Sequence, residues 1–272
     1  MSFSECLGLT AEEAVIGPTN GCLGVQFAPR PKTLDLVTVT RRPLSGEEAF
    51  MTRHYPPTSR HALTTALEHP DASLRLAAAL GAGTAPDPGQ ITLLVKRCGV
   101  EPDFFVRDML TWALTRHAQD LTLPLLLDEL RSPLAQARSQ ALHTLSKIGD
   151  PATWSAITSG HLHDPDPEVA RTAWRTAAGL VPTWQRAALA RELVRELGRG
   201  DKDLKRSLSR ALLMLGDDAM APLDAAAARH TDPAVRVHAC ASLRLIADPE
   251  SAFVLDPADA WRAGAPLPDA DE

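Results

Sequence analysis

The side chains best equipped for chemistry in this chain are a carboxylate, an aromatic ring, a hydroxyl, an imidazole and two guanidinium groups. They are Asp108, Trp112, Ser139, His143, Arg175 and Arg210. Trp112 follows Asp108 by four residues, so the two share one face of a helix. Exposed aromatic rings in polar company tend to mark recognition sites, which predicts a binding surface here. The alternative is that Trp112 and Trp174 only fill gaps between small residues.

The same residues allow a catalytic interpretation. Asp108 could stabilise a cationic sugar while Arg175 and Arg210 hold phosphates, as an enzyme acting on DNA requires. The formal charge of −6 argues against a surface built for nucleic acid. The sequence contains no Gly-rich phosphate loop, no G-x-S-x-G motif and no specific pair of carboxylates. We therefore expect no catalytic residue and no cofactor, with an enzyme as the alternative.

A second cluster, His161-Leu-His163-Asp164, offers three metal-capable side chains in four residues. A helix end explains it equally well, because histidine interacts favourably with a helix C-terminus and aspartate can cap the next helix. No fourth ligand is within sequence reach, so we expect no metal site.

Six arginines recur at separations of 30 to 35 residues, each before a helical run of Ala, Leu or Trp. They are Arg75, Arg107, Arg138, Arg171, Arg206 and Arg236. Self-similarity at such a period is the signature of a stacked helical solenoid. The arginines could line a groove for an anionic partner, or each could bond the adjacent turn and tie repeat to repeat. We favour the second interpretation, since solenoid repeats stack in register.

The elements that position these residues are pairs of helices, A and B, joined by a short turn. The clearest B helix is 135–149, whose apolar residues fall at helical spacing. No repeat can bury that stripe alone, so each needs its neighbours. The six predicted pairs cover 59–68 and 72–82, 88–98 and 103–117, 121–131 and 134–148, 151–161 and 166–180, 184–198 and 203–215, and 217–229 and 233–247.

Aspartate marks the start of most B helices. Asp71, Asp103, Asp166 and Asp232 stand where a side chain can cap free backbone N–H groups, and proline beside them is tolerated in a first helical turn. Gly149 is predicted to end the third B helix.

The repeat unit resembles the short bacterial form of the HEAT repeat, which carries Asp-Pro-x-Val-Arg at the turn into helix B. Residues 232–236, Asp-Pro-Ala-Val-Arg, match that signature, and residues 166–171 match it with one residue added. The marks of ankyrin and tetratricopeptide repeats are absent from this sequence. The resemblance covers about residues 59–249. It implies a right-handed, all-α solenoid of about six helix pairs whose B helices line a concave binding face.

Residues 101–116 and 137–150 also look like actinobacterial HEAT-repeat proteins, some of which carry the repeats behind a MerR-type DNA-binding head. This chain departs from them at residues 1–57, which contain no helix-turn-helix pattern and no basic recognition helix. Alkylpurine DNA glycosylases of similar architecture supply the enzymatic alternative. Bilin lyases share the repeat, but no motif here indicates a tetrapyrrole.

Two flanking segments do not fit the repeat. Residues 1–57 form an N-terminal extension, in which Thr10 opens a short helix and the runs 22–28 and 34–40 suggest a β-hairpin. Residues 58–249 are the repeat array. Residues 250–272 are predicted to be a cap followed by an acidic, Pro-rich disordered tail.

The remaining composition points to a reduced, cytoplasmic protein. The four cysteines are far apart, no apolar run is long enough to span a bilayer, and the start lacks a signal-peptide pattern. We thus expect a non-catalytic recognition or scaffold protein in a regulatory role. Its concave face would receive a protein, a peptide or a small effector, with nucleic acid a less favoured partner.

Overall fold

A computed structural model describes residues 60–262, and the regular structure in this range is entirely helical. The chain divides into Met1–Gly46 and Glu47–Glu272, and the described residues belong to the second unit. The predicted short helix at Thr10, the hairpin of 22–28 and 34–40 and the disordered end of the tail lie outside the described residues. Within 60–262, no helix combines the length and apolar character needed to cross a bilayer.

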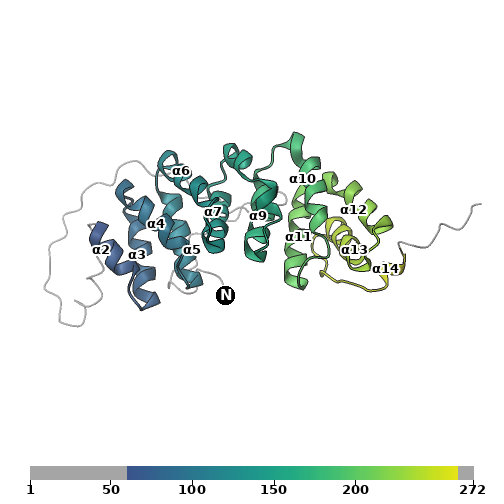
Figure 1. The fold of residues 1–272 in the computed structure, drawn as a ribbon, viewed down its shortest axis with the longest axis horizontal. Helices are drawn as coiled ribbons and strands as arrows, with labels where there is room; N and C mark the ends of the chain where they lie inside the picture. The colour runs from purple at the N-terminus through teal and green to yellow at the C-terminus, as the bar shows by residue number, and fades with distance from the viewer. Residues whose placement is uncertain (1–59, 263–272) are drawn as a thin grey trace, which may run out of the picture. The chain divides into compact units, whose positions relative to one another are not determined.

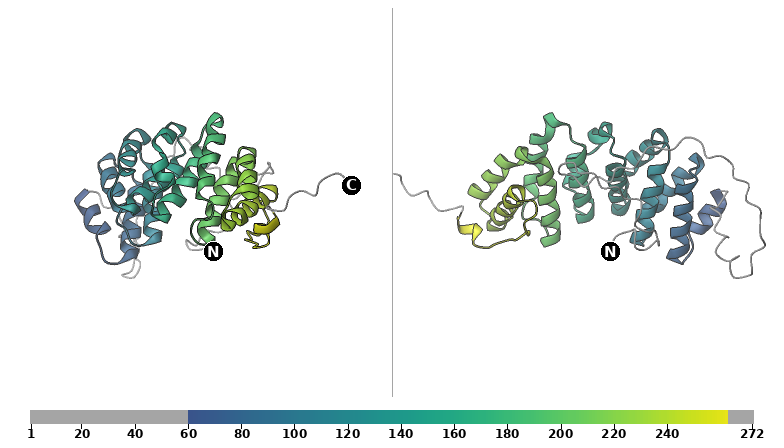
Figure 2. Two further views of the ribbon diagram at one scale, coloured as in Figure 1. Left: turned by 45° about the vertical axis from the view of Figure 1, so that its right-hand side comes forward. Right: turned by 180° about the vertical axis from the view of Figure 1, so that it is seen from behind.

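The B helices form one layer in which each contacts the next in chain order (Figures 1 and 2). Their bounds lie within three residues of the predicted ones. They are α3 (Ala72–Thr84), α5 (Phe104–Arg116), α7 (Ala135–Ile148), α9 (Pro167–Leu180), α11 (Lys202–Leu215) and α13 (Pro233–Ala247).

The A elements pack against their own B helices in all six pairs, and in five of them the A element is a helix of eight or more residues. These five helices are α2 (Arg60–Leu67), α4 (Ile91–Cys98), α6 (Gln119–Glu129), α10 (Arg186–Leu193) and α12 (Asp217–Arg229). Short 3₁₀ turns extend two of them: η2 (Pro88–Gln90) leads into α4, while η4 (Thr183–Gln185) and η5 (Val194–Glu196) flank α10.

The fourth pair differs, and the predicted continuous helix over 151–161 is wrong. A 3₁₀ segment, η3 (Pro151–Ala156), is followed by the four-residue helix α8 (Ser159–Leu162). Ile157 and Thr158 between them are β-branched and poor helix formers. Thr158 then begins the new turn through a reciprocal capping arrangement with His161. The fourth pair therefore has only a short A element against α9.

Aspartate side chains start five of the six B helices, as predicted for four of them. Each accepts a hydrogen bond from a backbone N–H two or three residues further on, and these residues are Asp71, Asp103, Asp166, Asp201 and Asp232. Leu134 occupies the same place before α7 without a side-chain bond. Gly149 ends α7 with φ +72°, a left-handed conformation that glycine adopts without steric cost. These caps define a common register for all six repeats.

That register corrects two members of the arginine series. In every B helix the residue four after the cap donates its backbone N–H to the cap carbonyl; these residues are Arg75, Arg107, Arg138, Ala170, Lys205 and Arg236. Arg171 and Arg206 therefore lie one residue beyond the equivalent position. The insertion inferred before Arg171 does not exist, because Ala170 takes the arginine's place in the repeat.

The core is made mostly of Ala and Leu, with one large exception in the middle of the array. Trp174 on α9 is fully buried, and its indole N–H donates to the carbonyl of Leu162 at 2.8 Å. Buried alanines at 170, 173, 177 and 178 on the same helix leave room for the ring. Trp174 thus fills a gap between small residues, whereas Trp112 is 36% exposed.

The described chain ends by packing against α13. Phe253 is buried with its ring 6.0 Å from the ring of His238, in an edge-on arrangement. Asp259, at the start of α14 (Asp259–Arg262), pairs with Arg244 at 2.7 Å. Arg236 donates to the carbonyl of Ala260 at 2.9 Å. The last B helix is therefore covered on the side where another repeat would otherwise stack.

Candidate functional site

The arginines that keep the common register bind turns of their own repeats. The Nη1 of each donates to the carbonyls six and five residues before it, at 2.6–3.2 Å; these residues are Arg75, Arg107, Arg138 and Arg236. A planar guanidinium suits this task because its several N–H groups point in fixed directions. These four arginines hold the turn between helix A and helix B, and their charge is directed into the structure.

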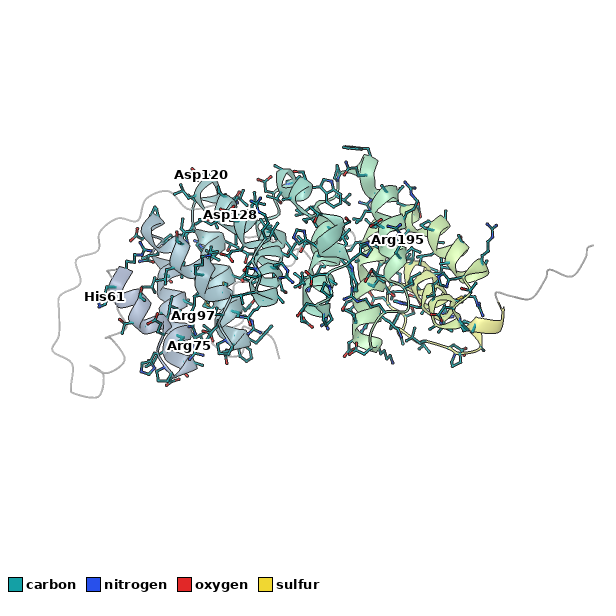
Figure 3. All side chains as sticks on the ribbon, viewed as in Figure 1. His61, Arg75, Arg97, Asp120, Asp128 and Arg195 are labelled. Carbon is teal, nitrogen blue, oxygen red and sulfur yellow. The ribbon has the colours of Figure 1, made fainter. Side chains whose placement is uncertain are left out.

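Glu101 joins the first two repeats at a buried ionic centre. Its carboxylate accepts a bidentate pair from Arg75 at 2.8 and 2.9 Å and a further bond from the Arg97 Nη2 at 2.6 Å. The backbone N–H of Asp103 donates to it at 2.9 Å. Arg75 and Arg97 are labelled in Figure 3, where their side chains lie near each other. Burial raises the pKa of Glu101, but the hydrogen bonds from Arg75, Asp103 and Arg97 outweigh it and lower the pKa to about 2.

The joint between the fourth and fifth pairs uses different groups. Ala170 cannot bind the turn carbonyls, and Arg199 from the next repeat donates instead to Asp164 O at 2.6 Å and Pro165 O at 3.1 Å. The ring of His163 lies between Glu192 at 2.7 Å and Glu196 at 2.5 Å. Partial burial lowers the pKa of His163, but the bonds to the two carboxylates outweigh that effect and raise it above its usual value.

The three metal-capable residues of the 161–164 cluster turn in different directions. His161 contacts the carbonyl of Leu130 at 3.1 Å, His163 faces the two glutamates, and Asp164 pairs with Arg138 at 2.9 Å. Among residues 60–262, no three His, Cys, Asp or Glu side chains come close enough to hold a metal ion. The cluster therefore ties repeats together.

The predicted recognition residues fall mainly into one row. Counting nine residues from each cap gives equivalent positions on five successive B helices: Leu80, Trp112, His143, Arg175 and Arg210. We call these five residues the central row. All are exposed except His143, which is half-buried. Asp108 lies one helical turn before Trp112 and is exposed as well.

Trp112 is fixed on the preceding helix by a glycine. A Cβ atom at Gly83 of α3 would lie 2.2 Å from Cζ3 of the Trp112 ring, so only glycine leaves room for it. The ring therefore lies across α3 with one side packed and the other open to solvent. Trp112 therefore fills the space beside Gly83, and 36% of the residue's surface remains exposed.

Charged groups from three successive B helices interact with His143 in the middle of the row. Burial, then the positive charges of Lys147 and Arg175, lower the pKa of His143, while Asp108 opposes the shift. Groups on α5, α7 and α9 therefore act on one imidazole. The lowered pKa favours neutral His143, which can donate one hydrogen bond and accept one.

Three further cations surround the row, and only one of them, Arg206, was named from the sequence, as a member of the arginine series. Arg116 and Lys147 lie thirteen residues after their caps, and Arg206 lies five after its cap. These three, with Arg175 and Arg210, are exposed and form no side-chain ion pair with the residues that the structure describes. Counting from the capping aspartates instead of from the arginines would have identified Arg116 and Arg206, whereas Lys147 follows Leu134, which gives no capping signal.

Ser139 does not belong to this surface, and its predicted exposure is wrong. It is only 7% exposed, and its hydroxyl lies 3.1 Å from that of Thr172 and 3.3 Å from the carbonyl of Glu168. The fifth position after the cap on α7 faces α9, because these two helices pack closely. Thr111, the residue before Trp112, is likewise buried, with 2% of its surface exposed.

One buried serine–histidine contact resembles catalytic machinery but cannot act as such. Nδ1 of His238 accepts a bond from the backbone N–H of Gly198, so the ring proton is on Nε2. Nε2 faces the hydroxyl of Ser209 at 3.1 Å and the carbonyl of Lys205 at 3.0 Å, and cannot take a proton from the hydroxyl. His238 is fully buried, and burial lowers its pKa to about 4.

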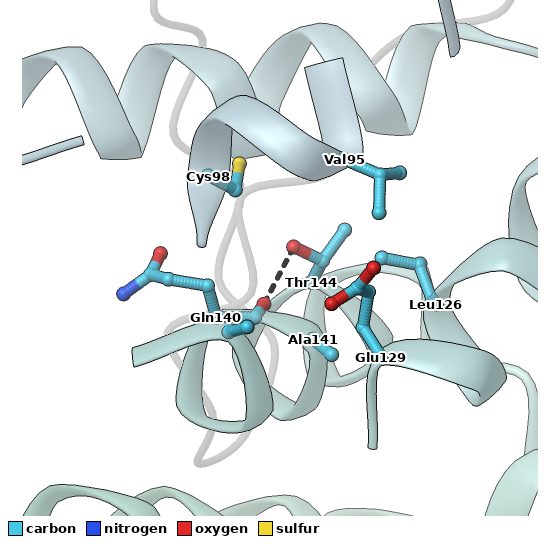
Figure 4. Close-up of a pocket in the computed structure, with 8 residues that line it drawn as sticks. Val95, Cys98, Leu126, Glu129, Gln140, Ala141 and Thr144 are labelled. Atoms are coloured by element: carbon cyan, nitrogen blue, oxygen red, sulfur yellow. Dashed lines mark hydrogen bonds between the residues drawn. The ribbon is translucent and has the colours of Figure 1, made fainter. Parts of the chain in front are cut away.

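The cysteine in the best-defined pocket is equally unreactive. Figure 4 shows this pocket between α4, α6 and α7, with Cys98 in its wall. Burial raises the pKa of Cys98 to about 12, which leaves the thiol protonated and poorly nucleophilic. The pocket has no room even for a water molecule, so it cannot hold a ligand.

Comparison with known proteins gives no assignment. No family model matches the chain, and no curated protein matches it. Among solved structures, an engineered protein is 19% identical, covering 69% of this chain and 96% of its own, with a TM-score of 0.39. Human deoxyhypusine hydroxylase is 19% identical over 80% of this chain and 91% of its own, with a TM-score of 0.37.

The complex of CpcE and CpcF of phycocyanin lyase from Nostoc sp. is 17% identical to this chain. It covers 84% of this chain and 97% of its own, with a TM-score of 0.32. Sequence identities and TM-scores as low as these assign no activity to the chain.

Proposed function

We propose that this chain is a non-catalytic recognition protein that binds a segment of a partner protein along the central row. We include in the proposal a right-handed, HEAT-like stacking of the six pairs, with the row on the concave side. The observation that supports it most is the row itself. Exposed Leu80 and Trp112 continue directly into His143, Arg175 and Arg210, whose arginines form no ion pair with described residues.

The spacing of helices suggests the length of the bound segment. Packed helices lie about 8–10 Å apart, so four intervals between five B helices span roughly 32–40 Å. An extended chain advances about 3.3 Å per residue, and about 10–12 residues would therefore cover the row. A protein segment of that length can contact every row position at once.

A small-molecule partner has less support in this geometry. Small ligands are usually enclosed in concave sites that bury most of their surface. The pocket in Figure 4 holds no such volume, and the row residues lie on open surface. We therefore favour a peptide or protein over a small effector.

The enzymatic alternative meets a similar difficulty. A DNA glycosylase must take the target base out of the stack into a fitted pocket. Asp108, the candidate carboxylate, is exposed on the surface beside Trp112. The geometry therefore gives no support to base excision at Asp108.

The test is capture from native lysate, with and without nuclease, by the full chain and by the double variant Arg175→Glu/Arg210→Glu. We expect specific proteins to be retained after nuclease treatment and lost with the variant. The matched control is Arg191→Glu/Arg229→Glu, which makes the same charge change at exposed arginines of α10 and α12. Equal capture by both double variants would remove the row as the binding surface, and capture abolished by nuclease would indicate nucleic acid.

A further inference from the structure

The central row changes character along its length. At one end, Leu80 is 42% exposed and Trp112 is 36% exposed, which is considerable apolar surface for side chains of this size. At the other end stand Arg175 and Arg210, with Arg206 one helical turn before Arg210 on α11. His143 lies between the two halves and is held towards its neutral form by burial and by the adjacent cations.

The basic half is a local feature and does not follow from composition. The chain as a whole carries a formal charge of −6, so acidic residues outnumber basic ones. At the row's basic end, Lys147, Arg175, Arg206 and Arg210 are all exposed without an ion-paired partner among the described residues. Like charges gathered on one surface repel one another, and an anionic partner relieves that repulsion.

The apolar half carries a carboxylate beside Trp112, and the exposed cation Arg116 lies one helical turn beyond the ring on α5. Asp108 is exposed one turn from Trp112, close enough to act on His143. A carboxylate at this place repels an acidic segment that enters the row in the wrong direction. Attraction at Arg175 and Arg210 and repulsion at Asp108 therefore favour one orientation.

We infer, resting on the proposed function, that the bound segment is acidic along one half and apolar at its other end. Its Asp and Glu residues lie over α9 and α11, and a bulky aliphatic or aromatic residue lies on Leu80 and Trp112. A peptide fits this surface better than a nucleic acid backbone does. A uniform phosphate chain would have to pass the carboxylate of Asp108 and the uncharged Leu80, and of the cations named above Arg116 alone lies at this end of the row.

A random dodecapeptide library displayed on phage and selected against the full chain tests this composition without a known partner. We expect enriched sequences to carry Asp or Glu in one half and Leu, Phe or Trp near the other end. Enriched sequences without that pattern, or no enrichment at all, would each overturn the inference. The lysate capture described above tests the proposed function separately.

Binding of one selected peptide, measured by fluorescence anisotropy, then tests the placement. We expect Arg175→Glu/Arg210→Glu to weaken binding by tenfold or more, and rising ionic strength to weaken it as well. Leu80→Ser should weaken it by a factor that salt does not change, whereas Arg191→Glu/Arg229→Glu should leave it unaltered. An unchanged affinity in the row variants, or tighter binding of single-stranded DNA of twelve nucleotides, would contradict the placement.

Discussion

Two joints of the array perform the same task with different chemistry. Between the first and second pairs, the permanently charged Arg75 and Arg97 form ion pairs with the fully buried carboxylate of Glu101. Between the fourth and fifth, the partners are a partly exposed imidazole, His163, and two glutamates, with Arg199 replacing the guanidinium that Ala170 lacks. The first joint is buried, and its charges persist at every pH well above 2. The second is accessible and one of its charges depends on pH.

The two joints should therefore respond to pH in opposite directions. The pKa of Glu101 is about 2 in the folded chain, below the ordinary value of about 4.3, so its stabilisation is complete above that value and is lost as pH falls towards 2. The pKa of His163 is raised, so its stabilisation is complete below about 6.5 and is lost as pH rises through the folded pKa. Of these two joints, the one between the fourth and fifth pairs is therefore the one whose charge changes near neutral pH.

The largest expected effect is at the first joint. Glu101→Gln leaves two arginines without a counterion in a buried site, and should lower the free energy of unfolding by about 3–5 kcal/mol in urea denaturation. The control is Glu168→Gln, which removes an exposed pair with Arg171 and should cost less than about 1 kcal/mol. Similar losses in the two variants would mean that the buried joint is no stronger than a surface pair.

A smaller loss of stability is expected at the joint between the fourth and fifth pairs, where Arg199 bonds the turn before α9. Arg199→Met keeps an unbranched apolar stem but removes the donors to Asp164 O and Pro165 O. We expect a loss of about 1–2 kcal/mol, since these carbonyls can still bind water. Urea denaturation beside Arg195→Met, whose partner Glu192 is a neighbour on the same helical turn, measures the difference. A larger loss for Arg195→Met would refute the role of Arg199.

The pH dependence itself should be smaller still. Replacing His163 by Gln removes the titrating charge between Glu192 and Glu196. The melting temperature of the unmodified chain should fall as pH rises above about 6.5, by the equivalent of up to about 1 kcal/mol, and the variant should not show this slope. His61→Gln, at an exposed position, should retain the slope. A slope that survives in His163→Gln would place the titrating group elsewhere.

The smallest expected effect is the energetic coupling between His163 and Arg199. Both bind Glu196, at 2.5 and 2.6 Å, so the double variant should lose less stability than the two single variants added together. We expect a coupling free energy of about 0.5–1 kcal/mol in a double-mutant cycle measured below pH 6.5. Additive losses would show that the two contacts are independent.

Local chemistry explains what the sequence predicted well. The B-helix starts at Asp71, Asp103, Asp166 and Asp232 were predicted because a cap needs only groups two or three residues away. The fourth A helix was missed because its interruption depends on the weak helix formers around Thr158 and on the capping turn with His161. The all-helical character of the described residues was predicted from the same periodicity that placed the helices.

Long-range contacts explain what the sequence could not predict. Arg171 and Arg206 were placed in the series because they stand one residue from the true register, and spacing alone cannot detect so small a shift. Ser139 was expected at the surface, yet Thr172, which is 33 residues away, covers it. The bond between Glu101 and Arg75 likewise joins residues 26 positions apart and has no local signal. The central row was predicted at four positions because helical geometry fixes them, while Leu80 was not selected.

Arg199 of the fifth pair donates hydrogen bonds to the turn before α9 in the fourth pair. This arrangement limits how the array can gain or lose repeats. In the first, second, third and sixth pairs the guanidinium belongs to the repeat whose turn carbonyls it binds, so these turns would keep those bonds if a whole pair were duplicated or removed. Between the fourth and fifth pairs this is not so, because the carbonyls of Asp164 and Pro165 depend on a side chain from the following unit. A new repeat inserted at that boundary would separate them, and the fourth and fifth pairs must be inherited, transplanted or deleted as one block.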